Sequence, residues 1–360
     1  HQGSGRVGGD GVMAKLGDYV KIRTGKLDAN ASSESGQYPF FTCAIEPLKI
    51  DSYSYDCECV LVAGNGDLNV KYYSGKFDAY QRTYIIESMD KTFLDVQYLY
   101  FFMDKYLETL RSQSIGGVIK YIKLGNLTEA DIFIPSIERQ REIVQILRKS
   151  RELISLRKQQ LAKLDELVKA RFVEMFGDPV VNSKRWSVET IENHIDLLTG
   201  FPFDSSGYVS KGVNICGGLI IMPQKIDWSA CKHWPQITGY EDYILRPNDI
   251  VIALDRPWIS NGFKIAMVDR EHLPALLIQR TARIRAVDIN QHYLMQSLLL
   301  GRFDKHCNIT GSLVPHISPK DIKSYSVMIP PIELQNQFAT FAERVDQEKR
   351  TVQQSLEKLE

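Results

Sequence analysis

Six stretches of the chain that are predicted to be loops carry side chains able to contact nucleic acid. Lys, Arg, Ser, Thr and backbone amides suit phosphate contacts, and Arg, Asn and Gln can also reach base edges. Three stretches lie in the first half of the chain and three in the second, at residues 24–26, 64–73, 112–123, 199–201, 255–264 and 308–316. The candidate DNA-binding residues in them are Thr24, Gly25, Lys26, Asn65, Lys71, Tyr72, Ser114, Lys120, Tyr121, Lys123, Thr199, Gly200, Arg256, Trp258, Ser260, Asn261, Lys264, Thr310, Ser312 and His316. Because every surface loop collects polar residues, these stretches fit ordinary solvent-exposed loops as well.

Two arginines hold matching places in a Gln-Arg-Thr sequence, Arg82 in the first half and Arg280 in the second. A guanidinium presents a planar fork of donors that fits a phosphate or a guanine edge. An ion pair inside each domain is an equally good interpretation, since a repeated residue often serves a repeated fold. His316 matches Tyr121 and could contact DNA or pack. Lys71 and Tyr72 could supply a phosphate contact and stacking, or cover the edge of a core.

The second half of the chain repeats the plan of the first. The sequence Ile-Pro-Ser-Ile-Glu from Ile134 returns as Ile-Pro-Pro-Ile-Glu from Ile329, and the same offset of 195 matches Gly116 with Gly311. Such duplication predicts two units of one fold. In each unit strand-like runs, at residues 38–44, 59–63 and 84–86 or at 250–254, 264–268 and 282–284, precede a helix over 96–111 or 291–302. Each unit is expected to begin with an amphipathic turn or helix ended by glycine.

A long helix is predicted over residues 138–176, which contain no Gly or Pro. Apolar side chains occupy most steps of an alternating spacing of four and three, the pattern of a coiled-coil seam, and Ser150, Arg157 and Arg171 occupy the remaining steps. A helix with such a narrow apolar stripe needs a partner helix, and the end of the chain repeats the stripe. We therefore expect two helices packed antiparallel through Ile143, Leu147, Ile154, Leu161 and Leu164 from the first and Phe338, Val345, Val352, Leu356 and Leu359 from the second.

Composition restricts the function classes. The 360 residues include 44 basic and 44 acidic side chains, so the net charge is zero and any DNA binding must depend on local patches. The six cysteines form no CxxC pair, which favours reduced thiols over a zinc or disulfide site. No apolar run is long enough to span a bilayer. Residues 1–12 are expected to be a tag or linker, and the protein is expected to be cytoplasmic, without a cofactor.

On the tandem layout and three motifs, the chain resembles the DNA-specificity subunits of type I restriction-modification enzymes. The motifs are IPSIERQREIVQIL and IPPIELQNQFATF, which open the two long helices, and QLAKLDELVKARFVEMFGDP, which closes the first. The resemblance covers residues 13–360. It implies an α+β fold with two target recognition domains, residues 13–134 and 179–328, and two conserved spacer helices, residues 135–178 and 329–360.

The resemblance also implies what the chain does. Each domain would read one half of a split, asymmetric sequence in double-stranded DNA. The paired helices would set the unspecified gap and dock two methyltransferase subunits, and restriction motor-nuclease subunits would join for cleavage. The chain itself would have no catalytic centre and no membrane attachment.

Other functions fit the sequence less well. Asp255-Arg256-Pro257-Trp258 loosely resembles the Asp-Pro-Pro-Tyr loop of amino methylases, but Arg256 replaces the first proline and no glycine-rich donor site accompanies it. A nuclease would need clustered carboxylates for magnesium, and none stands out. A coiled-coil adaptor that binds only proteins would explain the neutral charge, but not two large domains of one plan with divergent loops.

Overall fold

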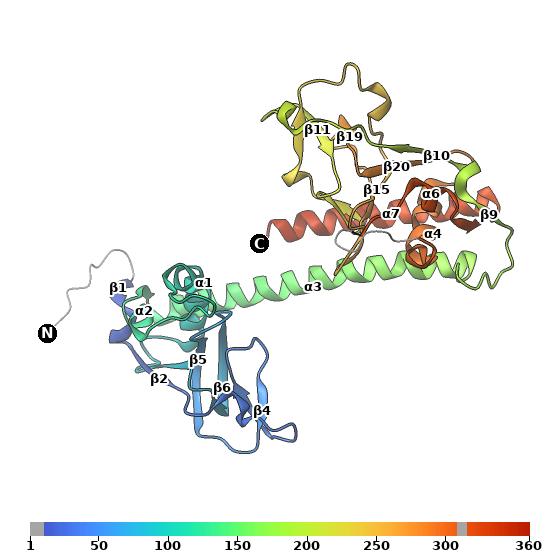
Figure 1. Cartoon of the computed structure of the whole chain (residues 1–360). Coiled ribbons are helices and arrows are strands. Elements are labelled where there is room, and N and C mark those ends of the chain that lie inside the picture. Colours follow the sequence, from blue (N-terminus) through green and yellow to red (C-terminus); the bar gives the residue numbers. More distant parts are fainter. Residues whose placement is uncertain (1–10, 308–314) are drawn as a thin grey trace. The chain divides into compact units, whose positions relative to one another are not determined.

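The computed structural model describes residues 11–307 and 315–360. The chain forms two compact units, unit 1 over His1–Ser155 and unit 2 over Leu156–Glu360, which are described separately. Figure 1 shows mixed sheets and helices in both units. The helix α3 (Ile137–Phe176, 40 residues) is continuous, so its first half belongs to unit 1 and its second half to unit 2.

Unit 1 is built on a six-stranded sheet in the order β2-β7-β5-β6-β3-β4. A separate strand pair joins the first strand of the unit to the last, and the remaining elements are two helices and two short 3-10 turns. The elements are β1 (Gly11–Lys15), η1 (Leu16–Asp18), β2 (Val20–Thr24), η2 (Ala29–Ala31), β3 (Tyr38–Phe41), β4 (Leu48–Ile50), β5 (Tyr55–Ala63), β6 (Val70–Ala79), β7 (Thr83–Ser88), α1 (Val96–Gln113), α2 (Leu124–Thr128) and β8 (Asp131–Pro135).

Alternation along the strands gives the sheet of unit 1 two buried faces. Val60, Val62 and Ile86 point to the face that α1 covers with Leu99 and Met103. The opposite face buries a second cluster, made of Phe41, Tyr55, Cys59, Leu61, Phe77, Ala79 and Ile85. Successive strand residues point to opposite sides of a sheet, so the near-continuous apolar run from Cys59 to Ala63 fits a central strand.

Three sequence expectations in unit 1 need correction. The segment before Gly25 was expected to be an amphipathic turn or helix, but it is the 3-10 turn η1 followed by the strand β2, in which Val20 and Ile22 pair with Ser88 and Ile86 of β7. The loop expected over residues 64–73 ends earlier, because β6 begins at Val70. Strand β1 begins at Gly11, two residues before the expected start of the first domain, and residues 1–10 lie outside the described residues.

Unit 2 contains a four-stranded sheet in the order β10-β20-β15-β18, a three-stranded sheet β14-β11-β19 and three strand pairs, β12-β13, β16-β17 and β21-β9. Its strands are β9 (Val188–Thr190), β10 (Ile195–Thr199), β11 (Val213–Cys216), β12 (Ile221–Met222), β13 (Lys225–Ile226), β14 (Lys232–Trp234), β15 (Ile250–Ala253), β16 (Trp258–Ile259), β17 (Gly262–Phe263), β18 (Ile265–Met267), β19 (Ala275–Leu277), β20 (Thr281–Ala286) and β21 (Ser326–Met328). Its helices are η3 (Ile191–His194), η4 (Ser205–Gly207), η5 (Trp228–Ala230), η6 (Glu241–Tyr243), α4 (Gln291–Leu300), α5 (Phe303–His306), α6 (Pro319–Lys323) and α7 (Ile332–Glu357).

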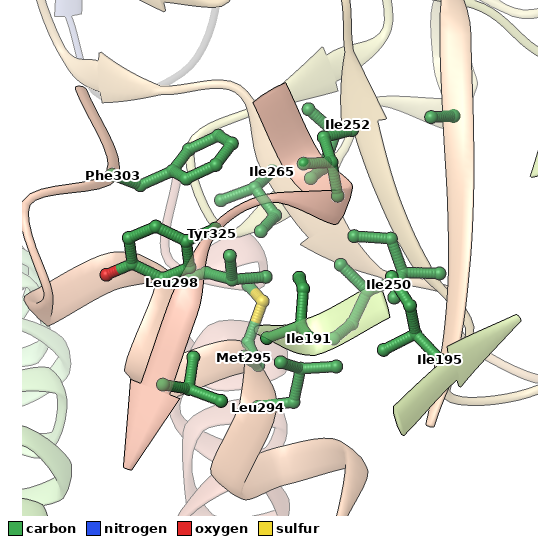
Figure 2. Packing of buried hydrophobic residues seen from close by; sticks show 14 of the residues in the cluster. Ile191, Ile195, Ile250, Ile252, Ile265, Leu294, Met295, Leu298, Phe303 and Tyr325 are labelled. Carbon is green, nitrogen blue, oxygen red and sulfur yellow. The ribbon is translucent and has the colours of Figure 1, made fainter. Parts of the chain in front are cut away.

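Figure 2 shows the main core of unit 2, in which isoleucines of the sheet face residues of α4. Ile250, Ile252 and Ile265 are fully buried, and Leu294 and Leu298 of α4 meet them from the other side. As in unit 1, the segment begins with a turn, the 3-10 turn η3, but the element that ends at the glycine is a strand, β10, and not the turn or helix itself.

The second half of α3 packs antiparallel against α7 inside unit 2. Phe172 and Phe176 contact Phe338 near the start of α7, with ring centroids 5.4 and 5.7 Å apart. Further along, Lys349 Nζ lies 2.5 Å from Asp165 Oδ1, and Lys158 Nζ lies 2.7 Å from Glu360 Oε1. The predicted seam is therefore real where Leu164, Val168, Phe338 and Val345 share one cluster, and Val352 and Leu356 are buried.

The N-terminal half of α3 behaves differently from the predicted seam. Ile143, Leu147 and Ile154 belong to unit 1, and Leu147 is 37% exposed, whereas its neighbour Val144 is 6% exposed. This half of α3 is attached to unit 1 by polar contacts. Arg151 binds Asp104 with Nη2 at 2.6 Å from Oδ2, and its guanidinium stacks over Phe101 at 4.5 Å. A heptad pattern cannot tell which partner a helix face will meet, so it overestimated the length of the seam.

A repeated glutamine joins each long helix to its own unit. The amide of Gln140 is fully buried: Oε1 accepts from the backbone N–H of Asp95, and Nε2 donates to the carbonyls of Phe93 and Pro135. Gln335 does the same for Asn290 and Pro330. Asp95 and Asn290 are the N-caps of α1 and α4, so each glutamine links the start of a domain helix to the start of a long helix.

No helix in the described part of the chain is long and apolar enough to cross a membrane.

Candidate nucleic-acid interface

In unit 1, glycines bring four separate segments of the candidate interface together. Gly25 N–H donates to the carbonyl of Thr83 at 3.1 Å, and Gly64 N–H donates to that of Arg82 at 2.8 Å. A Cβ on Gly25 would lie 2.1 Å from the carbonyl oxygen of Ala79, and one on Gly64 would lie 2.4 Å from that of Arg82. Only glycine permits such close backbone approach, so the exposed Thr24, Lys26 and Arg82 become neighbours through main-chain contacts.

The loop before Lys123 completes this surface. Gly66 N–H donates to the carbonyl of Lys120 at 2.9 Å, and Ile122 N–H donates to that of Gly64 at 2.9 Å. Asn65 and Tyr121 form a β-bridge, which holds the exposed Lys120 and Tyr121 beside the turn after β5. The structure therefore gathers Thr24, Lys26, Asn65, Arg82, Lys120 and Tyr121, which the sequence places far apart.

Unit 2 repeats the same framework with different side chains. Gly200 N–H donates to the carbonyl of Thr281, and Leu254 N–H donates to that of Arg280. A Cβ on Gly200 would lie 1.9 Å from the carbonyl oxygen of Ile278, a close approach like that at Gly25. Asp255 and His316 form the bridge that corresponds to Asn65 and Tyr121. The main-chain contacts around Gly200 and the Asp255–His316 bridge therefore reproduce in unit 2 the loop arrangement of unit 1.

The charges at these equivalent places differ between the units. Asp255 accepts from Arg280, with Oδ2 at 2.9 Å from Nη1, and its Oδ1 lies 2.7 Å from His316 Nδ1. The ion-pair interpretation therefore holds for Arg280, although 74% of its side chain stays exposed. The exposed Arg82 has no ion pair with a described residue. His316 is half-buried and contacts Asp255 within the unit, which fits the packing interpretation, and its contact with DNA stays a prediction.

Some candidates lie inside the fold and not on the surface. Lys264 is 7% exposed, and its Nζ donates to the carbonyl of Gly218; burial, with Arg256 nearby, lowers its pKa. Trp258 stacks on Phe263 at 4.9 Å and packs against the main core of unit 2. Lys264 and Trp258 were selected because residues 255–264 were expected to be one open loop, but β16 and β17 form a short hairpin there. Its turn leaves Ser260 and Asn261 exposed.

Lys71 and Tyr72 belong to β6, as the corrected loop boundary requires. Tyr72 O–H donates to Glu58 Oε1 at 2.8 Å on the face that α1 covers, so the core-edge interpretation holds for it. Lys71 Nζ donates to Asn69 Oδ1, and burial lowers the pKa of Lys71.

Ser114 caps the end of α1 through its Oγ, which donates to the carbonyl of Arg111 at 2.7 Å. Exposed Thr199, Arg256 and Lys123 remain candidates. Thr310 and Ser312 lie outside the described residues.

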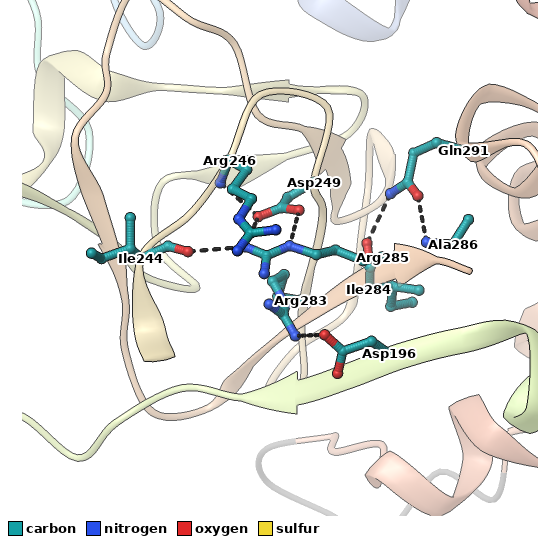
Figure 3. Close-up of polar contacts among 9 residues, drawn as sticks. All are labelled: Asp196, Ile244, Arg246, Asp249, Arg283, Ile284, Arg285, Ala286 and Gln291. Carbon is teal, nitrogen blue, oxygen red and sulfur yellow. Dashed lines mark hydrogen bonds and ion pairs between the residues drawn. The ribbon is translucent and has the colours of Figure 1, made fainter. Parts of the chain in front are cut away.

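The sequence did not single out an arginine cluster on β20 of unit 2, which Figure 3 shows. Arg285 makes a two-point contact with Asp249, with Nε–Oδ1 at 2.6 Å and Nη2–Oδ2 at 2.8 Å, and Arg283 Nη2 lies 2.5 Å from Asp196 Oδ2. Arg283 is 4% exposed, and burial lowers its pKa, as does Arg285 beside it. Alternation with the core residues Ala282 and Ile284 could have shown that both arginines share the other face, but not that the face is buried.

Among the described residues, no group of three or more His, Cys, Asp or Glu side chains is placed to hold a metal ion. The candidate interface therefore consists of hydrogen-bond donors, acceptors and cations on loops. These groups can bind an anionic polymer and read polar edges.

Comparison with known proteins names the family. Residues 10–166 match the model of the type I restriction modification DNA specificity domain. The specificity-subunit resemblance seen in the sequence is confirmed, because curated relatives carry that name and one of them aligns with nearly the whole chain.

Two relatives show how far the likeness extends. The type I restriction enzyme EcoDI specificity subunit of Escherichia coli is 36% identical over 166 residues, which cover 46% of this chain and 37% of that subunit. The MjaVIII specificity subunit of Methanocaldococcus jannaschii is 24% identical over 98% of this chain and 91% of that protein. The chain thus spans little more than a third of the EcoDI subunit but most of the MjaVIII subunit.

Solved structures confirm the tandem α+β fold. The S subunit of a type I restriction-modification system from M. genitalium matches with a TM-score of 0.61 and 15% identity, covering 96% of this chain and 92% of that chain. A chain from a structure entitled "Structural basis underlying complex assembly andconformational transition of the type I R-M system" matches with a TM-score of 0.54 at 15% identity, covering 98% of this chain and 95% of that one. At such identity the likeness concerns the fold alone.

Proposed function

We propose that this chain is the sequence-reading subunit of a type I restriction-modification system. Unit 1 and unit 2 each recognise one half of a split site in double-stranded DNA, and the chain acts in the cytoplasm without a cofactor. The observation that carries the proposal is the repeated framework of loops, in which Asn65 with Tyr121 and Asp255 with His316 hold equivalent places. One backbone arrangement with different side chains suits two readers of different sequences.

The electrostatics of the loops support DNA as the ligand. The chain as a whole is neutral, yet Lys26, Arg82 and Lys120 are exposed within one loop cluster of unit 1. Local cations of this kind position a protein on phosphates, whereas amides and guanidinium groups read base edges. In unit 2 the exposed Arg256 and Arg280 would take the same roles.

The long helices would set the gap between the half-sites and dock two methyltransferase subunits. Support comes from the continuous 40-residue α3, because an uninterrupted helix is a stiff spacer. The chemistry would belong to the partners: methyl transfer to the docked subunits and cleavage to motor-nuclease subunits. The chain itself would be non-catalytic.

The first experiment compares charge removal in the two units. The chain is co-expressed with its methyltransferase subunit, and the methylated sites of the host genome are mapped. We expect Arg82→Ala to relax only one half-site and Arg256→Ala to relax only the other, each by about 1–3 kcal/mol. Lys105→Ala is a matched control, since Lys105 is an exposed cation on α1 outside the loop cluster. Equal relaxation of both half-sites by one variant would contradict modular reading.

The second experiment changes the spacer. A heptad is inserted into α3 between Arg151, which is tied to unit 1, and Lys158, which pairs with Glu360 in unit 2. Seven helical residues add about 10 Å, or about three base pairs of duplex. We expect a longer gap with both half-sites unchanged. Methylation of DNA by the purified chain without a partner would instead show that the chain is an enzyme.

A further inference from the structure

The loop before Lys123 in unit 1 is a hairpin with an apolar, exposed tip. Ile115 N–H donates to the carbonyl of Tyr121 at 3.0 Å, and Tyr121 N–H donates to that of Ile115 at 2.8 Å. Beyond this pair the chain turns through Gly116, whose φ is +116° and whose Cβ would lie 2.5 Å from the carbonyl oxygen of Ile119. The base of the hairpin is fixed to the turn after β5 by the bridge between Asn65 and Tyr121.

Two aliphatic residues occupy the tip. Val118 is 104% exposed and Ile119 is 63% exposed. Turns normally use Gly, Asn, Asp, Ser or Pro, because these residues either supply the backbone conformation or satisfy its polar groups. A pair of β-branched side chains gives the turn neither advantage. An aliphatic pair that gains nothing in the free chain can still gain from being covered by a partner.

The surroundings of the tip indicate what covers it. Residues 112–123 include Lys120 and Lys123 and no Asp or Glu, and both lysines are exposed. Through Gly66 and Gly64 the hairpin adjoins the exposed Arg82, so the apolar tip lies in a part of the candidate interface that carries several exposed cations. An apolar group ringed by cations fits a polyanion with an apolar interior better than it fits a neutral protein groove.

The sequence repeats the feature. At the offset that matches Gly116 with Gly311, the counterparts of Val118 and Ile119 are Leu313 and Val314, which are also adjacent aliphatic residues. These two lie outside the described residues, so only their identity bears on the argument.

We infer that the hairpin tip enters a groove of the DNA duplex, where Val118 and Ile119 pack against the bases while Lys120 and Lys123 bind the flanking phosphates. The inference rests on the proposed function and names the element of unit 1 that makes apolar contact. Aliphatic side chains in a groove contact thymine methyl groups or wedge between base steps, and both contacts depend on the sequence or on its deformability.

The test uses the chain assembled with its methyltransferase subunit and a duplex that carries the methylation site mapped in the host. Val118→Ser/Ile119→Ser is compared with Lys120→Ala. Both changes are at exposed side chains, so both variants are expected to keep the wild-type melting temperature and to assemble with the partner. We expect the double serine variant to bind the site about tenfold or more weakly with an unchanged salt slope, because apolar contacts release no counterions. The lysine variant is expected to lower the slope of log K against log salt by about one.

A 2-aminopurine scan across the unit 1 half-site then locates the tip. We expect one position whose fluorescence change on binding is lost in the double serine variant and kept in the lysine variant. If wild-type protein binds the site and the double serine variant binds it equally, the inference is overturned while the proposed function stands. Loss of assembly with the methyltransferase in the double variant would also overturn it, since the tip would then be a protein contact. If the wild-type assembly fails to prefer the mapped site over a scrambled duplex, the proposed function itself fails.

Discussion

Asn65 of unit 1 and Asp255 of unit 2 stand at the same place in a repeated framework but carry different charges. Asn65 bridges Tyr121 beside an arginine, Arg82, that pairs with no described carboxylate, whereas Asp255 holds Arg280 and His316. The framework is held by main-chain hydrogen bonds through glycines, which do not depend on these side chains. The difference shows how one fold can present two unlike surfaces: the contacts that build it and the groups that face the ligand are separate.

The units also differ inside the fold, on the face of the main sheet that carries Ile85 in unit 1 and Arg283 and Arg285 in unit 2. In unit 1, Ile85 of β7 is fully buried in an aromatic cluster with Phe77 and Tyr55. The matching strand of unit 2, β20, has Arg283 and Arg285 on that face, paired with aspartates (Figure 3). Pairing makes a buried arginine tolerable, since an unpaired charge would cost several kcal/mol in desolvation. Unit 2 therefore has paired arginines at positions where unit 1 has Ile85 and Glu87, and Glu87 itself pairs with Arg23 of β2 at 2.7 Å.

The largest effect is expected from breaking the shared framework. Gly25→Ala and Gly200→Ala should each lower the free energy of unfolding by about 3 kcal/mol or more, because the added Cβ would collide with a backbone oxygen that cannot retreat without moving a strand. Denaturant unfolding of the full chain measures it. Gly117→Ala is the matched control, since nothing lies within 4 Å of its added Cβ. Similar stability of Gly25→Ala and the control would show that close backbone approach does not hold the loops together.

The buried glutamines should come next. Gln140→Ala leaves the N–H of Asp95 and the carbonyls of Phe93 and Pro135 without their partner, and Gln335→Ala does this for Asn290 and Pro330. We expect about 2–3 kcal/mol of destabilisation for each, from buried polar groups left unsatisfied. The exposed Gln145→Ala should change stability by less than about 0.5 kcal/mol. Amide hydrogen exchange should become faster in α1 in the Gln140→Ala variant and in α4 in the Gln335→Ala variant. The same exchange pattern in both variants would contradict the view that each glutamine holds only its own domain helix.

A smaller effect should follow when unit 2 is made to resemble unit 1. Asp255→Asn removes the carboxylate that holds Arg280 and His316, and Arg280 is already largely exposed, so stability should change by less than about 1 kcal/mol. Removing a negative charge beside Arg256 and Arg280 should strengthen non-specific DNA binding several-fold at low salt. Titration of a random duplex at two salt concentrations tests this result. Weaker binding would mean that Asp255 orients the arginine for DNA instead of neutralising it.

The smallest effect concerns a histidine that only unit 2 possesses. Burial disfavours the charged ring of His194, but Asp288 at 2.7 Å and Glu189 at 3.1 Å outweigh it and raise its pKa. A raised folded pKa contributes stability that is fully present below the unfolded value, about 6.5, and is lost as the pH rises through the folded value. The stability advantage over His194→Gln should therefore shrink as the pH rises from 5 to 8. His233→Gln is the control, because the side-chain partner of His233 is the thiol of Cys231 and not a carboxylate.

The sequence alone determined the elements that depend on local periodicity. The length of α3, the start of α7 and the order of domain helices followed from spacing and from the absence of Gly and Pro, because helical hydrogen bonds join residues four apart. The internal repeat also indicated which loops correspond, so the loops that hold Thr24, Asn65 and Lys120 were selected before their contacts were known. A glycine or glutamine that recurs in both units, however, indicates that the position is important in each unit, but it does not indicate which residues the position contacts.

Tertiary structure decided everything that depends on partners distant in sequence. β2 is a strand and not a helix because Ile22 pairs with Ile86, and Lys264 is buried because the β16–β17 hairpin turns it toward Gly218. The pairing of Asp255 with Arg280 and His316 joins positions that no spacing rule connects. Ile143 and Leu147 follow the heptad pattern, yet they lie outside the cluster that α3 shares with α7. An apolar stripe on a helix predicts that the stripe will be covered, but it does not specify which element covers it. Local periodicity sets which elements form, and the packing of distant segments sets which side chains are left to face a ligand.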